Sequence, residues 1–234
     1  MSAERMGDYE RTLYPFLDDE PPAAAAAPAL LAEVRASTAL KCADVVALRR
    51  RLRDEYAERL IDAAEAMAAR FARGGKLLAF GNGGSATDAQ DAAADCLAPP
   101  VAGWRALPAL ALPNDVAVVT ALANDVGVAH VYARQVAALA DPDDVALAIS
   151  TSGNSANVEA ALAEARRRGL LTIALAGYDG GAIARDGGGA ADFAFVARLE
   201  YVPRIQEGHA TLWHVLLELV QAILADGAAP RGTV

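Results

Sequence analysis

The chain has 234 residues, a formal net charge of −9 and a hydrophobic fraction of 54%, which indicates an acidic folded protein with one good-sized core. The acidic balance argues against a nucleic-acid partner, because such proteins present a basic face. The sequence contains no long uncharged apolar run and no apolar segment near its N-terminus. We therefore expect no membrane span, no secretory signal and a cytoplasmic location.

The N-terminal part predicts a loosely ordered arm over residues 1–28, where Pro21, Pro22 and Pro28 interrupt any helix and the alanines bury little surface. Residues 30–73 show helical spacing of apolar side chains, and the glycines at 74–75 end that pattern. The apolar stripe of this predicted helix consists of Val46, Leu48, Leu52, Tyr56, Leu60, Ile61, Ala64 and Met67. Cys42 and Cys96 are isolated in the sequence, so we expect buried thiols rather than a disulfide.

After residue 75 the pattern alternates between short apolar strands and amphipathic helices. Strands are predicted at 76–80, 106–112, 144–150, 170–177 and 193–197, and helices at 85–97, 115–123, 128–140, 156–168 and 204–224. Apolar strands separated by helices predict a parallel sheet that is covered on both faces. The sequence thus predicts a three-layer α/β domain over residues 29–228, with N-terminal helical residues in front and a short tail at 229–234.

Two polar loops follow predicted strands, GNGGS at 81–85 and STSGNS at 150–155. Glycines let the backbone approach an anion, hydroxyls donate to its oxygens, and the following helix directs its N-terminal amides at it. The alternative for the second loop is a polar turn in which Ser155 only caps the next helix. The presence of two such loops at equivalent strand ends favours a ligand site, because ligands of parallel sheets bind there.

A dinucleotide site is a second interpretation of the first loop, since Gly81, Gly83 and Ala86 fit the pattern G-x-G-x-x-G/A. A site of that kind needs an acidic residue about 20 residues further on to bind the ribose. The first acid after the second predicted strand is Asp115, which is too far along the chain. A phosphate ligand without the dinucleotide is therefore favoured.

The helix after the first loop carries Asp88, Asp91 and Asp95 within about 60° of one another around its axis. One interpretation is an exposed acidic face on an acidic protein. The other is a functional pair, because two carboxylates four residues apart bind a divalent cation or supply a general base. The position directly behind a phosphate-type loop favours the functional pair.

Three sequence blocks together, GNGGSATDAQ, ISTSGNSANV and RIQEGHATLWH, resemble the sugar isomerase (SIS) fold, a flavodoxin-like parallel sheet. They resemble the phosphoheptose isomerases more closely, over about residues 40–226. The resemblance implies conversion of sedoheptulose 7-phosphate to D-glycero-heptose 7-phosphate through an enediol. It also implies a homotetramer whose active sites are shared between subunits.

The resemblance also assigns residues to the substrate. Its hydroxyl loop implies phosphate binding by Ser150, Thr151, Ser152 and Ser155. The residues implied to line the sugar are Asn82, Gly83, Gly84, Ser85, Asn124, Asp125 and Gln206.

The family binds zinc through a His and a Glu on the first helix and a Gln and a His on the last. Gln206 and His214 match the second pair, whereas Asp91 and Asp95 stand where the family has its His and Glu. The resemblance implies Asp95 as base, His214 as acid or base, and metal ligation by all four. Because carboxylates replace a nitrogen ligand, manganese or magnesium would also suit this set. The basic residue that the family often has a turn later is Pro99 here.

Two other functions share parts of this pattern. One is a non-catalytic SIS protein of the replication-initiator-associating type, which binds phosphosugars or proteins. Those relatives tend to lose the last histidine and alter the serine loop, whereas His214 and STSGNS are intact here. The other is a SIS isomerase of amino sugars or pentose phosphates, which usually carries further domains or motifs.

Overall fold

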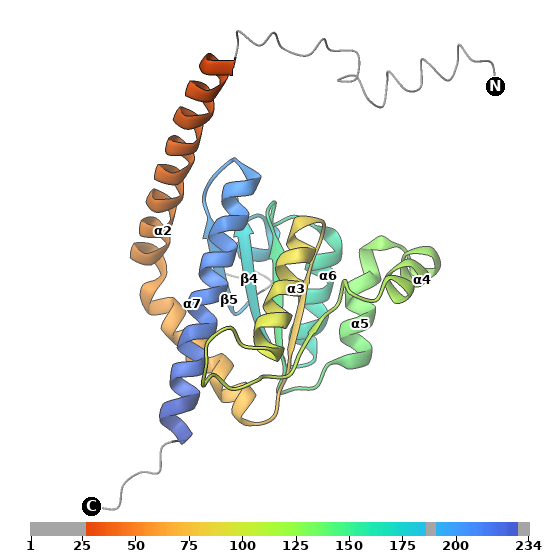
Figure 1. Ribbon diagram of the computed structural model, residues 1–234. Coiled ribbons are helices and arrows are strands. Elements are labelled where there is room, and N and C mark those ends of the chain that lie inside the picture. The colour runs from red at the N-terminus through yellow and green to blue at the C-terminus, as the bar shows by residue number, and fades with distance from the viewer. Residues whose placement is uncertain (1–26, 186–190, 229–234) are drawn as a thin grey trace, which may run out of the picture. The chain divides into compact units, whose positions relative to one another are not determined.

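The computed structural model describes residues 27–185 and 191–228 (Figure 1). The chain divides into two units, residues 1–43 and residues 44–234. The predicted arm and tail lie almost wholly outside the described residues, so the predicted domain boundaries stay predictions. The interruption predicted at Pro28 was wrong, because helix α2 (Ala27–Ala72) already includes Pro28 in its first turn. An N–H has no intrahelical partner there, so proline is tolerated.

The predicted stripe of α2 is largely confirmed within residues 44–72. The side chains that it buries are Leu48, Leu52, Tyr56, Leu60, Ala64 and Met67. Val46 and Ile61 were predicted in the same stripe, but each is 47% exposed. Because a helix turns by about 100° per residue, Ile61 points well away from the direction of Leu60.

All five predicted strands form one parallel sheet with the order β2-β1-β3-β4-β5. They are β1 (Leu77–Gly81), β2 (Ala109–Ala111), β3 (Val145–Ser150), β4 (Leu171–Gly177) and β5 (Phe193–Ala197). The edge strand β2 is shorter than the predicted 106–112. This order is that of the flavodoxin-like doubly wound fold.

Helices cover both faces of the sheet, as Figure 1 shows. They are α3 (Gly84–Leu97), α4 (Val116–Val126), α5 (Val131–Leu139), α6 (Ala156–Arg167) and α7 (Val202–Ala228), with 3-10 turns η3 (Val128–His130) and η4 (Ala182–Ala184). Residues 48–71 of α2 pack with α3 and α7 on one face, and α5 and α6 pack on the other. The predicted three-layer α/β architecture is therefore confirmed.

The strand order fixes where a ligand can bind. The chain leaves β1 toward β2 on one side and later returns to β3 on the other, so β1 and β3 are neighbours with diverging connections. Ligands of such sheets bind in the crevice outside the carboxyl ends of these strands. The two polar loops, 81–85 and 150–155, follow β1 and β3 and thus meet at this crevice.

Two smaller observations concern sequence expectations. Within the described residues one segment, Val202–Asp226 of α7, is long and apolar enough to cross a membrane. Its residues Leu216 and Val220 are buried in the core, and a core helix passes the same test, so this is weak evidence for a span. Cys96 is buried as expected, which raises the pKa of its thiol to about 12, but Cys42 is exposed.

Candidate active site

The two polar loops are joined directly by a pair of amide side chains. Asn82 and Asn157 exchange two hydrogen bonds, each 2.8 Å long, from the first loop to the first turn of α6. Helix α3 begins at Gly84, after Gly83 with a φ of 56°. The N-termini of α3 and α6 therefore lie beside each other at the crevice, where both present free backbone amides.

The hydroxyl groups of the second loop face one another. The Oγ atom of Ser150 lies 3.1 Å from Oγ of Ser155 and accepts a hydrogen bond of 3.1 Å from the Gly153 amide. Ser155 occupies the N-cap position of α6, yet its side chain makes no capping hydrogen bond. The hydroxyl is turned into the loop. A simple helix cap would instead accept a hydrogen bond from an amide in the first turn of the helix, whereas an anion-binding loop directs its hydroxyls inward.

The shape of this loop depends on glycine at position 153. Its φ is 66°, and a Cβ atom there would lie 2.1 Å from the carbonyl oxygen of Gly180. Asn154 adds a further link, because its Oδ1 accepts a 2.9 Å hydrogen bond from the amide of Ala182. The turn at 179–182 thus packs against the hydroxyl loop and fixes its shape.

Helices α3 and α7 place the predicted acids opposite the predicted amide. A Cβ added to Gly84 would lie 2.1 Å from Nε2 of Gln206, so the amide end of Gln206 lies against the start of α3. Burial raises the pKa of Asp88 to about 6, a hydrogen bond from Gln206 lowers it, and the charge of Asp91 raises it further. The Oδ2 atom of Asp88 is buried without a hydrogen-bond partner.

The predicted base and acid lie close together one turn further along α3. The Nε2 atom of His214 is 3.7 Å from Oδ2 of Asp95. The same oxygen accepts a 3.0 Å hydrogen bond from the indole N–H of Trp213. Sequence reasoning missed Trp213, because nothing in its local pattern indicates a partner 118 residues earlier.

A cavity of about 70 Å³ lies beside His214 and Trp213. It is lined by Asp88, Asp91, Ile149, Leu175, His209, Ala210, Trp213 and His214. Ile149 and Leu175 belong to the ends of β3 and β4, so the cavity adjoins the hydroxyl loop that follows Ile149.

His209 is the fully buried member of that lining. Its Nε2 lies 2.8 Å from the carbonyl oxygen of Ala176, which requires Nε2 to donate. Burial lowers the pKa of His209 to about 4, so the ring is neutral at pH 7. Its second nitrogen, Nδ1, is buried without a partner.

Two predicted sugar-lining residues lie apart from these groups. Asn124 and Asp125 were expected in a loop, but α4 continues through Val126 and both are exposed on it. The Nδ2 atom of Asn124 donates to Oδ1 of Asp125 at 2.8 Å. No hydrogen bond within the described part of the chain joins either of them to the two loops.

The predicted metal ligands Asp91, Asp95, Gln206 and His214 lie on the same two helices without forming a metal site. Among the described residues no three Asp, Glu, His or Cys side chains are placed to hold a metal ion. Zinc takes three or four protein ligands, and the Asp, Glu, His and Cys side chains of the described residues do not come together in such a number. The donor set as it stands does not fit the zinc that the resemblance implies.

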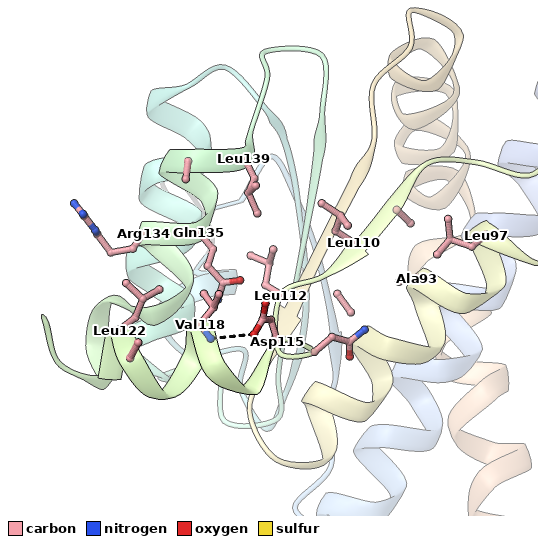
Figure 2. Close-up of a pocket in the computed structure, with 15 residues that line it drawn as sticks. Ala93, Leu97, Leu110, Leu112, Asp115, Val118, Leu122, Arg134, Gln135 and Leu139 are labelled. Carbon is pink, nitrogen blue, oxygen red and sulfur yellow. Dashed lines mark hydrogen bonds between the residues drawn. The ribbon is translucent and has the colours of Figure 1, made fainter. Parts of the chain in front are cut away.

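A larger cavity, of about 760 Å³, opens between β2, α3, α4 and α5 (Figure 2). Leu97, Leu110, Leu112 and Leu139 point into it, and its polar members include Asp115, which caps α4 through the amide of Val118. None of the predicted site residues lines it. Its mostly apolar wall lacks the acid–base pairs that proton transfer needs, so the smaller site between α3 and α7 is the better candidate.

Comparison with known proteins identifies the family. Residues 42–177 match the family described as SIS domain. The chain belongs to the SIS domain family. Among SIS proteins, it is 48% identical over 170 residues to the phosphoheptose isomerase of Geobacter sulfurreducens, covering 73% of this chain and 88% of that relative.

Solved structures of SIS relatives agree with this result. Phosphoheptose isomerase GmhA from Neisseria gonorrhoeae superposes with a TM-score of 0.73 at 36% identity, covering 81% of this chain and 99% of that one. A phosphoheptose isomerase from Francisella tularensis gives 0.68 at 32% identity, with coverage of 79% and 98%. The predicted SIS fold and the resemblance to phosphoheptose isomerases are both confirmed.

Proposed function

We propose that this chain is a phosphoheptose isomerase that converts sedoheptulose 7-phosphate to D-glycero-heptose 7-phosphate. One observation carries the proposal: His214 and Asp95 are in contact between α7 and α3 of a SIS fold. The hydroxyl-rich loop that follows β3 at the switch point of the sheet supports it. Relatives with the name phosphoheptose isomerase match the chain at 40–48% identity over most of their length.

The reaction moves one proton between neighbouring carbons through an enediol. Asp95 removes a proton from C1 of the ketose while His214 donates a proton to the carbonyl oxygen on C2. Return of the first proton to C2 and loss of the O1 proton then give the aldose. The 3.7 Å separation of the two side chains suits groups that serve adjacent atoms of one substrate. Separations of this size often tighten when substrate binds.

The phosphate is proposed to bind between the two helix N-termini. Ser150, Thr151, Ser152 and Ser155 would donate to its oxygens, and the amides at the start of α6 would add their dipole. The sugar would extend from there along Asn82, Gly83, Gly84 and Ser85 toward Gln206. Asn124 and Asp125 lie on α4, so α4 of the same or of another subunit would have to bring them to the sugar.

A metal ion has no step in this proposal. Zinc would polarise the carbonyl if Asp91, Asp95, Gln206 and His214 gathered around it. We propose direct proton transfer instead, because no three described Asp, Glu, His or Cys side chains are placed to hold a metal ion. A chelation experiment therefore tests whether the activity depends on a metal ion, including manganese or magnesium.

The remaining expectations are carried as proposals from family membership. A homotetramer is supported by the apolar exposed residues of α4, Val116 and Val118, which no other described segment covers. A cytoplasmic location is consistent with the composition. A non-catalytic binding role is not favoured, since the serine loop and His214 are both present.

Direct assay tests the proposed function. Purified protein is incubated with sedoheptulose 7-phosphate, and the aldose is followed by the appearance of its anomeric proton signals. Fructose 6-phosphate and ribulose 5-phosphate serve as substrate controls for other SIS isomerases. Conversion of the heptose phosphate alone supports the proposal, and absence of any conversion by folded protein contradicts it.

A further inference from the structure

The indole N–H of Trp213 forms a hydrogen bond to Asp95, the proposed base, from the side of the core. Its N–H donates to Oδ2 of Asp95 at 3.0 Å, and Trp213 as a whole residue is only 4% exposed among the core side chains of α2, α3 and α7. Asp95 itself is partly buried, with 23% of its side chain exposed. A hydrogen bond from a neutral donor to a carboxylate in such a place is stronger than one at the surface.

The chemistry of this contact limits what it can do. An indole N–H donates and never accepts, so Trp213 cannot relay a proton to or from Asp95. A carboxylate on a helix otherwise changes rotamer freely, and a bond to a ring packed in the core restrains it. No hydrogen bond within the described residues reaches Oδ1, so this oxygen stays available to take a proton.

We propose that Trp213 is a positioning residue, which holds Oδ2 of Asp95 by its indole N–H and thereby presents Oδ1 for proton transfer beside His214. The proposal rests on the proposed function where it gives Asp95 the role of base. It goes beyond that function because it assigns a determinant of the reaction to a residue that acts through Asp95.

Nuclear magnetic resonance tests the contact itself. The chain has two tryptophans, Trp104 and Trp213, so a ¹H–¹⁵N spectrum shows two indole signals, which Trp104→Phe and Trp213→Phe assign. Asp95→Ala removes the acceptor and leaves both rings in place. We expect the Trp213 signal to shift and its N–H to exchange faster with solvent, while the Trp104 signal stays. An unchanged Trp213 signal overturns the proposal.

Kinetics test what the contact does. Trp213→Phe keeps an aromatic ring and removes the donor, so we expect kcat to fall about 10- to 100-fold, the effect of one hydrogen bond to a charged group, with little change in KM. Trp104→Phe, a matched change in a half-buried ring elsewhere in the core, should leave both constants unchanged.

A double-mutant cycle separates positioning from packing. In an Asp95→Asn background, Trp213→Phe should cause little further loss, because the carboxylate that it holds is already gone. An equal loss in both backgrounds, or a loss carried by KM, would show a structural role and overturn the proposal. If the wild-type protein converts no heptose phosphate, the proposed function fails, and the indole signals still decide whether Trp213 holds Asp95.

Discussion

His214 and Asp95 face each other across α7 and α3, with Nε2 of the histidine 3.7 Å from Oδ2 of the aspartate. The histidine side chain is 65% exposed and the aspartate side chain 23% exposed. The pair therefore combines an anchored carboxylate with an accessible imidazole. This is the arrangement that a base and a proton donor need when they act on two neighbouring atoms of one substrate.

Ser155 distinguishes an anion cradle from a helix cap. Because its hydroxyl makes no cap bond and faces Ser150, Ser155→Ala should raise KM for the sugar phosphate by about tenfold, the effect of one hydrogen bond to a charged group. The melting temperature of the Ser155→Ala variant should hardly change. Thr120→Ala, whose hydroxyl only bonds within α4, is the matched control. A drop in stability without a rise in KM would favour the helix-cap interpretation.

Alanine substitutions at Gly153 and Gly169 distinguish the cost of backbone strain from the cost of a steric clash. Both have positive φ, 66° and 82°, but only Gly153 has a neighbour, the Gly180 oxygen, within 4 Å of an added Cβ. Gly169→Ala should lower the free energy of unfolding by about 1 kcal/mol through strain alone. Gly153→Ala should lower it by clearly more. Urea unfolding measures both, and equal losses would show that the turn at 179–182 yields easily.

His209 predicts part of the acid sensitivity of the fold. Its pKa is about 4 in the folded protein and 6.5 for an ordinary histidine. As pH falls below 6.5 the unfolded chain takes up this proton first, so stability falls between pH 6.5 and pH 4. His209→Gln keeps an N–H donor for Ala176 and does not titrate.

Melting temperatures at pH 7 and pH 5 test this expectation. The wild-type protein should lose more than the His209→Gln variant over that interval. Asp88 and the other carboxylates titrate in both chains and cancel in the comparison. Equal losses would mean that His209 takes up its proton in the folded state without a penalty.

Metal removal tests the direct proton transfer. Protein dialysed against a chelator, with its residual metal measured by mass spectrometry, should retain its turnover, because no three described acidic, histidine or cysteine side chains are placed to hold an ion. Loss of turnover on chelation, restored by one equivalent of zinc, manganese or magnesium, would contradict this. It would mean that Asp91, Asp95, Gln206 and His214 rearrange around a metal.

Local patterns were sufficient to predict most of the fold. The alternation after residue 75 predicted every strand of the described residues, because buried parallel strands are continuous apolar runs. The helix boundaries differed where capping decides them. Helix α4 runs on through Val126 to Gly127, three residues past its predicted end, and α7 begins at Val202.

Contacts between distant residues could not be predicted in the same way. The hydrogen bonds between Asn82 and Asn157 link positions 75 residues apart, and neither residue has a neighbour in sequence that signals the other. Trp213 is adjacent to His214 in sequence, yet its partner Asp95 comes within hydrogen-bonding distance only because α3 and α7 pack together. The orientation of a site depends on such packing, whereas its residue types are visible in the motifs.

Deuterium transfer tests the central claim most directly. Folded protein is incubated with sedoheptulose 7-phosphate in deuterated water, and deuterium at C1 of the ketose and C2 of the aldose is measured by mass spectrometry and magnetic resonance. The enediol route through Asp95 and His214 predicts incorporation at these carbons. Asp95→Asn and His214→Ala should each slow it by about 100-fold or more, whereas His130→Ala should not. Incorporation at wild-type rate in both variants, or none in the wild-type protein, would contradict the account.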